Sequence, residues 1–365
     1  CVGLSSYFAL DITDPENPQF LWEFTDKDLG FSFSGPGLIK KEGKDYLLFA
    51  SGPTNYRGDS GQNLKFFVVD VDTGSAVRVI DTGIQNAFGG RLFTEGLDYD
   101  EDGFTDYIAL GYARKDGSMN NWKGGILFLD VTDNDVNKWS YRVYFQDAQD
   151  AILTKVEYMK CFNRWYMYFG SGRWFYKTDN PLSGQRERIY GIPLRCNNGE
   201  CEPVTDVADV TDSSENVCTD AQNGVIRGWY VRLDPNEEGY MKERSITDPT
   251  PIDQNVIIFP TSQPTGDLCG FGGRSRVWIL NCATGGAVDD SCPGYKIDKL
   301  TGKLLLQLSG GDIREISLSQ FINNTPVKRS TDFYVGLTPD HEQIVIMPAS
   351  TQEVKSGRIL LWLEK

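Results

Sequence analysis

One unit recurs along this chain and limits its possible folds more than any other feature. A short apolar strand ends in an aspartate, a turn follows, and a second strand comes after the turn. The three clearest copies end their first strand at Asp11, Asp70 and Asp130, which are 59 and 60 residues apart (70 − 11 and 130 − 70). Weaker copies follow at residues 189–193, 229–234 and 277–281. Short strands repeating at such a period are typical of a β-propeller.

The residues between these copies support the same architecture. Earlier strands are expected at 46–50, 107–111 and 165–170. Helical signal is nearly absent, because no long segment keeps apolar residues at helical spacing. A two-sheet sandwich is the alternative, but it needs no such period. We expect an all-β chain in which residues 1–365 form a single, modified β-propeller domain with about six to seven blades.

The first copy starts without the leading strands that precede the later copies. We therefore expect the propeller to be incomplete at the N-terminus. On this interpretation the chain is a fragment of a longer polypeptide whose N-terminal part is absent, and closure of the ring needs residues outside it.

The segment from Asp98 to Asp106 carries the clearest chemical signal. Asp98, Asp100 and Asp102 stand at alternate positions, Gly103 is sixth, the carbonyl of Phe104 is seventh and Asp106 is ninth. Oxygens at these positions can wrap one Ca²⁺ ion when a glycine allows the turn. The sequence departs from an EF-hand because its twelfth position is an alanine that begins no helix, inside the strand expected at 107–112. An acidic turn that binds nothing is the alternative.

Composition excludes several classes of function. The net charge of −15 argues against nucleic acid or an anionic membrane surface as a partner. The single histidine, His341, excludes a multi-histidine metal centre, and we expect it in an exposed turn. Apolar runs are strand-length and broken by charge, so we expect no transmembrane segment.

The eight cysteines predict disulfides and an oxidising compartment. No C-x-x-C spacing of a zinc or redox site occurs among them. Cys196 and Cys201 enclose a hairpin turn and form the clearest candidate pair. One more local pair is expected among Cys269, Cys282 and Cys292, although spacing does not fix the connectivity.

Several of these segments together resemble the C-terminal propeller of PilY-type type IV pilus proteins. The resemblance covers most of residues 1–285, and its motifs keep the order they have in that family. The motifs that carry it are residues 7–18 with 21–24, 69–74 with 80–83, 98–107, 169–175 with 189–192, 228–233 with 243–244, and 258–261 with Cys269 and 272–275.

The resemblance implies a non-enzymatic function. A protein of this family helps type IV pili assemble and resist retraction, sits at the pilus tip or cell surface, works with minor or tip pilins and can act as an adhesin. Calcium in the matching loop influences pilus extension and retraction. The resemblance assigns the ligand roles to Asp98, Asp100, Asp102, Asp106 and the carbonyl of Phe104.

Two other functional interpretations remain open. The units also resemble the blades of quinoprotein dehydrogenases, which bind pyrroloquinoline quinone and calcium at the centre of the propeller. Against that enzyme class, the chain has no adjacent Cys-Cys pair, and the carboxylates of its calcium loop would leave few open sites for a quinone. The other interpretation is a purely structural propeller that calcium stabilises by mass action.

Two further segments are candidates for binding. Arg57, Gly58 and Asp59 form a tripeptide in a turn-rich loop, of the kind that a host or surface receptor can bind. The acidic segment from Asp206 to Asp220 could hold a second cation, but it lacks the alternation and the glycine of the first loop. We therefore expect that segment to be a solvated loop.

Overall fold

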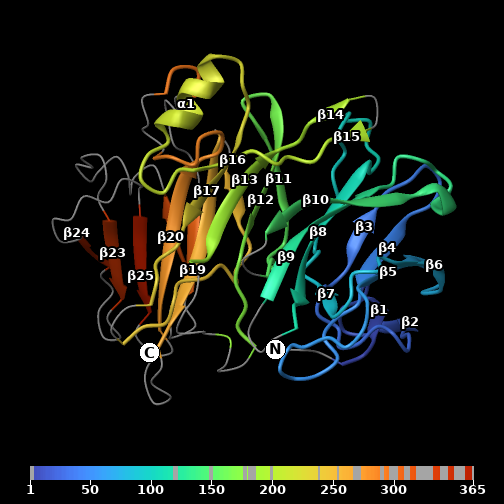
Figure 1. Cartoon of the computed structure of the whole chain (residues 1–365). Coiled ribbons are helices and arrows are strands. Elements are labelled where there is room, and N and C mark those ends of the chain that lie inside the picture. Colours follow the sequence, from blue (N-terminus) through green and yellow to red (C-terminus); the bar gives the residue numbers. More distant parts are fainter. Residues whose placement is uncertain are drawn as a thin grey trace. The chain divides into compact units, whose positions relative to one another are not determined.

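The computed structural model describes residues 4–117, 122–147, 151–175, 179, 186–197, 200–236, 239–252, 255–265, 273–287 and 292–295, with the strands at 303–307, 313–317, 332–337, 344–348 and 358–363. Two compact units make up the chain (Figure 1). The first comprises residues 1–156, 172–181 and 196–203. The second comprises residues 157–171, 182–195 and 204–365. His341, Cys1 and Cys269 lie outside the described residues.

The first unit contains two four-stranded antiparallel sheets in which each strand pairs with the next along the chain. Strands rich in aromatic and β-branched residues and separated by short polar turns favour this meander. The first sheet is formed by β3 (Gly37–Ile39), β4 (Tyr46–Ala50), β5 (Lys65–Asp70) and β6 (Ala76–Asp81). The second is formed by β7 (Ala87–Gly89), β8 (Tyr107–Lys115), β9 (Trp122–Asp130) and β10 (Ser140–Asp147), with a 3₁₀ turn, η1 (Val136–Lys138), before β10.

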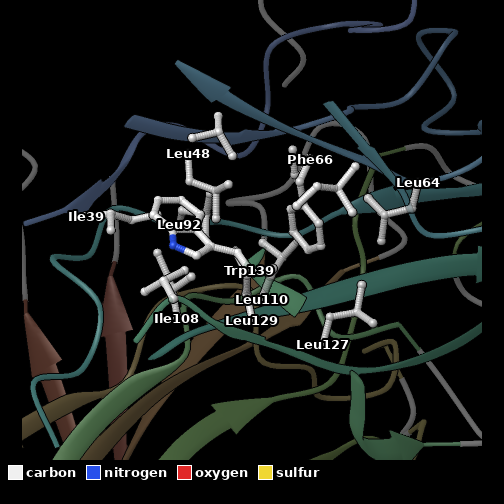
Figure 2. Packing of buried hydrophobic residues seen from close by; sticks show 14 of the residues in the cluster. Ile39, Leu48, Leu64, Phe66, Leu92, Ile108, Leu110, Leu127, Leu129 and Trp139 are labelled. Carbon is white, nitrogen blue, oxygen red and sulfur yellow. The ribbon is translucent and has the colours of Figure 1, made fainter. Parts of the chain in front are cut away.

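The two sheets share one apolar core (Figure 2). Leu48 and Phe66 of the first sheet pack with Ile108, Leu110 and Leu127 of the second, and each of these side chains is at most 1% exposed. The burial of β5, β8 and β9 on both faces explains why these strands are continuously apolar instead of alternating. This core fixes the loops at the strand ends, including the one before β8.

Two hairpins complete the first unit: β1 (Tyr7–Asp11) with β2 (Gln19–Phe24), and β14 (Cys196–Asn197) with β15 (Glu200–Cys201). Trp22 of β2 docks onto the turn after β5, where its indole N–H donates to the carbonyl of Val71 at 2.9 Å. A Cβ at Gly74 would lie 2.6 Å from the indole ring, so only glycine allows this contact. The β1–β2 hairpin is thus attached to the first sheet by the packing of Trp22 against Gly74.

The second unit contains a five-stranded sheet of order β11-β12-β13-β17-β16 and a six-stranded sheet of order β18-β19-β20-β25-β23-β24. Most neighbouring strands are antiparallel; β16 with β17 and β23 with β25 are parallel. The strands of the first sheet are β11 (Glu157–Cys161), β12 (Arg164–Gly170), β13 (Arg188–Pro193), β16 (Val207–Asp209) and β17 (Gly228–Arg232). Those of the second are β18 (Thr250–Ile252), β19 (Val256–Pro264), β20 (Gly273–Asn281), β23 (Asp332–Leu337), β24 (Ile344–Pro348) and β25 (Arg358–Leu363). The remaining elements are the hairpin of β21 (Lys303–Gln307) with β22 (Ile313–Ser317) and the helix α1 (Glu215–Gln222).

The tryptophan contact of the first unit recurs in the second. The indole N–H of Trp229, at the start of β17, donates to the carbonyl of Cys282 at 2.9 Å. A Cβ at Gly285 would lie 2.5 Å from the Trp229 ring. Cys282 follows the last residue of β20 as Val71 follows the last residue of β5, and each glycine comes three positions later. One pair of consecutive sheets in each unit is therefore joined by the same kind of contact.

Among the residues that the structure describes, three disulfides join six cysteines. The expected pair of Cys196 with Cys201 is confirmed. The expected local pair among Cys269, Cys282 and Cys292 is wrong, because Cys282 bonds to Cys161 and Cys292 bonds to Cys218. Folding brings these partners together from 121 and 74 residues away, which sequence spacing cannot indicate.

The all-β expectation is confirmed at the level of a mostly β chain with several antiparallel sheets. The near-absence of helix needs one correction, because α1 begins inside the acidic segment from Asp206 to Asp220. That segment was expected to be a loop, and it also contains β16. Its eight residues bury only Val217, too few apolar positions to give a visible helical period. Among the described residues, no helix is long and apolar enough to cross a membrane.

Candidate metal site in the Asp98–Asp106 loop

The acidic loop lies between β7 and β8 and is closed at its base by the backbone. Leu97 and Tyr107 form an antiparallel bridge, with the N–H of Leu97 donating to the carbonyl of Tyr107 at 2.7 Å and the N–H of Tyr107 donating back at 3.1 Å. Tyr107 is buried and stacks on Phe128 of β9. Because both ends are held by a buried strand, the nine residues between them project as one closed loop.

Three of the four aspartates converge. Asp98, Asp100 and Asp106 each place one carboxylate oxygen within 4.8 Å of the others. Calcium–oxygen distances of about 2.3–2.6 Å put two oxygens on one ion no more than about 5 Å apart. The three oxygens are therefore spaced so that a single Ca²⁺ ion can contact all of them.

Main-chain N–H groups shape the loop around these carboxylates. The two oxygens of Asp98 accept from the N–H of Asp102 at 3.0 Å and of Gly103 at 2.7 Å. Asp106 accepts from the N–H of Tyr99 at 2.8 Å. Such local bonds are characteristic of aspartate in turns, so the chain needs no metal to approach this geometry.

The glycine at the sixth position is required by the backbone. Gly103 has a φ of +93°, which L side chains rarely adopt, and a Cβ there would meet no atom within 4 Å. Glu101 also lies in the left-handed region, with a φ of +65°. The turn therefore depends on left-handed backbone and not on lack of space, as the sequence pattern predicts.

The carboxylate of Asp106 is poorly compensated. Burial raises its pKa above the ordinary value, and the negative charges of Asp100 and Asp102 raise it further, against hydrogen bonds from Tyr99 and Asp100. Burial, with Asp130 and Asp106 nearby, also raises the pKa of Tyr107 to about 12. Both shifts have the direction expected where negative charge accumulates without a matching cation.

The other two predicted ligands are placed differently. Asp102 lies outside the convergent group, and its Oδ1 accepts from the N–H of Phe104 at 2.8 Å. Phe104 is about one-third exposed, with its side chain 37% accessible. The structure thus brings together Asp98, Asp100 and Asp106. The ligand roles of these three, of Asp102 and of the carbonyl of Phe104 remain predictions.

Thr105, inside the nine-residue segment, and Lys41, outside it, hold the last turn of the loop. Thr105 is 2% exposed; its N–H donates to the carbonyl of Lys40 at 3.0 Å, and its hydroxyl donates to the carbonyl of Glu95 at 3.0 Å. The ammonium of Lys41 donates to the carbonyl of Thr105 at 2.8 Å. No local sequence pattern links Lys41 to the loop, because it follows β3 of the other sheet and lies more than 50 residues before Asp98 in the chain.

The loop that contains Arg57, Gly58 and Asp59 is held internally. The Asp59 carboxylate forms an ion pair with Lys115 at 2.8 Å. The carbonyls of Arg57 and Gly58 accept from the buried guanidinium of Arg173 at 2.9 and 3.0 Å. Arg57 is exposed, whereas Gly58 is buried and Asp59 is half-buried. A receptor that binds the Asp59 carboxylate would therefore have to displace Lys115.

Carboxylates of the acidic segment from Asp206 to Asp220 form ion pairs with arginines. Asp206 and Asp220 flank the guanidinium of Arg227 at 3.1 and 3.2 Å. Asp209 lies 2.8 Å from Arg232. These ion pairs give the carboxylates internal partners, which supports the expectation that this segment is not a second cation site.

Comparison with known proteins gives distant relatives from one group. No protein-family model matches the chain. A type IV pilus biogenesis factor PilY1 homolog of Xylella fastidiosa is 27% identical over 78% of this chain and 21% of the relative. The type IV pilus biogenesis factor PilY1 of Pseudomonas aeruginosa strain PAO1 is 26% identical over 78% of this chain and 28% of the relative. The chain is thus a distant homologue of PilY1 proteins and spans between a fifth and a third of their length.

Proposed function

We propose that this chain is a calcium-binding β-propeller of the type IV pilus machinery. In this role it supports pilus assembly and calcium-regulated extension and retraction, at the pilus tip or cell surface, together with minor or tip pilins. The convergence of Asp98, Asp100 and Asp106 carries the calcium part of the proposal. The distant homology to pilus biogenesis factors carries the pilus part and favours a non-enzymatic role.

The proposal that residues 1–365 form one propeller domain is supported by the form of the sheets and by the contacts that join them. A blade is a four-stranded antiparallel meander, and the β3–β6 and β7–β10 sheets both have this form. The tryptophan contacts at Gly74 and Gly285 join consecutive sheets by one repeated device, as expected when blades repeat. Closure of the ring into six to seven blades, with or without further residues of a longer chain, is part of the proposal.

The donor set suits calcium because it consists of oxygens alone. Asp98, Asp100 and Asp106 would hold the ion, and small rotations would bring in Asp102 and the carbonyl of Phe104. A bound Ca²⁺ ion supplies positive charge that offsets the repulsion among the clustered carboxylates. Without that charge, we expect the loop to populate more open arrangements, which gives calcium a means of changing the surface presented to a partner.

Disulfides and acidity agree with the proposed location. Three disulfides form and persist in oxidising compartments, consistent with an extracytoplasmic protein.

An adhesive role belongs to the proposal as well. The exposed Arg57 loop is the candidate contact for a host or surface receptor, subject to the internal ion pair of Asp59.

Calorimetric titration of the purified chain with calcium tests the proposal. We expect one site in the wild type and a loss of affinity of about tenfold or more in Asp100→Ala, because affinity follows the number of charged ligands. The matched control is Asp72→Ala, an exposed aspartate of another turn, which should bind as the wild type does. Unchanged affinity in Asp100→Ala would remove the site assignment.

A parallel titration with pyrroloquinoline quinone separates the enzymatic alternative. Binding of the quinone would move the chain to the quinoprotein class. Calcium binding without any effect of calcium on binding to purified tip pilins would leave the purely structural alternative.

A further inference from the structure

Lys41 is a buried cation at the end of the acidic loop. It follows β3 of the first sheet, whereas the loop belongs to the second sheet, and its side chain is 6% exposed. Its ammonium donates to the carbonyl of Thr105 at 2.8 Å and to the carbonyl of Thr132 at 3.3 Å. Thr105 directly precedes Asp106, so a full positive charge lies beside the base of the candidate metal site.

The charge of Lys41 is not neutralised by a carboxylate in contact. Both hydrogen bonds of the ammonium go to main-chain carbonyls. The neighbouring lysines differ in this respect, since Lys40 pairs with Glu95 at 2.5 Å and Lys138 pairs with Asp133 at 3.0 Å. Burial costs an ammonium free energy, so its retention here needs a compensating interaction.

That compensation comes from the acidic turns around it. Burial lowers the pKa of Lys41, whereas the charges of Asp106, Asp102, Asp130 and Asp133 act to raise it, in decreasing order. The two strongest belong to the predicted ligand set. Lys41 therefore already supplies part of the positive charge that the loop carboxylates need, and a metal ion bound there would be repelled by it.

We infer that Lys41 is a fixed internal cation that lowers the metal affinity of the Asp98–Asp106 loop, by an amount that grows with the charge of the ion. The inference rests on the proposed calcium function. Coulomb repulsion from one fixed charge is proportional to the charge of the ion, so a trivalent ion is penalised about 1.5 times as much as a divalent ion on a logarithmic scale. Lys41 thus keeps calcium binding reversible and sets the charge selectivity of the site.

A purely positional role for Lys41 predicts something different. Its bonds to Thr105 and Thr132 also fix the last turn of the loop, so removing the side chain could loosen the site. A looser site would weaken the attraction of the carboxylates, which also scales with the charge of the ion, so it would lower the affinity for Tb³⁺ more than the affinity for Ca²⁺. The ratio of the trivalent to the divalent affinity separates the two roles, because they change it in opposite directions.

The test is to titrate the wild-type chain, Lys41→Met and Lys41→Gln with Ca²⁺ and with Tb³⁺ by calorimetry. Lys41→Gln keeps an N–H donor for the carbonyls and covers the case in which Lys41→Met does not fold. Both neutral variants should bind Tb³⁺ more tightly relative to Ca²⁺ than the wild type does; a tenfold gain for Ca²⁺ should accompany a gain of about thirtyfold for Tb³⁺.

Two controls retain positive charge at Lys41. Lys41→Arg and the exposed-residue variant Lys40→Met should both leave the Tb³⁺ to Ca²⁺ ratio as in the wild type. An unchanged ratio in both neutral variants would overturn the inference while leaving the calcium site intact. If the wild type binds neither ion, the proposed calcium function fails first and the inference fails with it.

Discussion

Two aspartate-containing loops of the first unit share one kind of local hydrogen bonding and have opposite electrostatics. In the Arg57 loop, the side chain of Asn55 accepts from the N–H groups of Arg57 and Asp59, much as Asp98 accepts from Asp102 and Gly103 in the acidic loop. Burial alone would raise the pKa of Asp59, but hydrogen bonds from Lys115 and Asn55 lower it below its ordinary value. The pKa of Asp106 is raised instead.

The difference shows what makes an aspartate motif available to a ligand. The negative charge of Asp59 is paired with the ammonium of Lys115, and this ion pair holds the loop. The converging carboxylates of Asp98, Asp100 and Asp106 face one another, and the nearest buried ammonium contacts carbonyls. A motif that looks equally exposed in a sequence can therefore hold its own loop together in one place and form a candidate cation site in another.

The largest expected effect is a loss of stability when Arg173, which holds the Arg57 loop, is replaced. Arg173 is 3% exposed, pairs with Asp179 at 2.9 Å and lies 3.6 Å above the ring of Trp122. Arg173→Met leaves Asp179 and two carbonyls without this partner, and should lower the free energy of unfolding by about 3–5 kcal/mol. Urea denaturation measures the change, and calcium affinity should stay within the error of the wild-type value.

The matched control for Arg173→Met is the same substitution at the exposed Arg57. Arg57→Met should change the free energy of unfolding by no more than about 0.5 kcal/mol. A comparable loss in both variants would mean that the stability of the loop does not depend on the buried guanidinium.

The next effect concerns calcium itself. At a free concentration one hundred times Kd, calcium should raise the free energy of unfolding by about 2.7 kcal/mol. Thermal unfolding with and without calcium should show this gain in the wild type and in Asp59→Asn. In Asp100→Ala, a tenfold or greater loss of affinity limits the gain to about 1.4 kcal/mol or less at the same calcium concentration. A gain that disappears in Asp59→Asn would reverse the assignment of the two loops.

A glycine from each loop sharpens the comparison further. Gly58 has a φ of +76°, and a Cβ there would lie 2.5 Å from the ring of Phe175. Gly58→Ala should therefore cost about 1–3 kcal/mol of overpacking beyond the backbone strain. Gly103→Ala meets open space and should cost only the strain of its left-handed backbone, about 1 kcal/mol. Phe175→Leu should partly restore Gly58→Ala and should not affect Gly103→Ala; equal costs of the two alanines would contradict the packing difference.

The smallest effect comes from a third aspartate turn. A hydrogen bond from Lys44, 2.5 Å from the carboxylate, lowers the pKa of Asp70 below 3.8, and the N–H groups of Thr73 and Asp72 add to this. A carboxyl whose pKa is lower in the folded state stabilises the fold above pH 3.8, and this contribution is lost as the pH falls through the folded value. Asp70→Asn should thus flatten the loss of stability below about pH 4 in urea denaturation. An unchanged slope would mean that Asp70 is not held as an anion.

The sequence was a good guide to the strands and to the local turns. The strand expected at 46–50 is β4, and the segments ending at Asp11, Asp70 and Asp130 are β1, β5 and β9. Each of these aspartates accepts from the N–H group two residues later. Apolar runs, glycines and aspartate turns are local, so one sequence contains them in full.

Features that depend on distant partners could not be predicted in this way. The carboxylates of the acidic loop are visible in the sequence. The sequence does not indicate that Asp102 stays outside the converging group or that Lys41 lies beside the base of the loop. The same holds for the Cys161–Cys282 bond and for the arginine that clamps the Arg57 loop. These contacts follow from which strands lie side by side, and no local pattern specifies that.

A crystal structure of the chain grown with calcium tests the central claim most directly. We predict one ion with oxygens of Asp98, Asp100 and Asp106 at about 2.3–2.6 Å, with Asp102 and the carbonyl of Phe104 completing the shell. The ion should give anomalous scattering that identifies it as calcium. A loop that remains closed by its own N–H groups at saturating calcium, with no ion among the three carboxylates, would contradict the account.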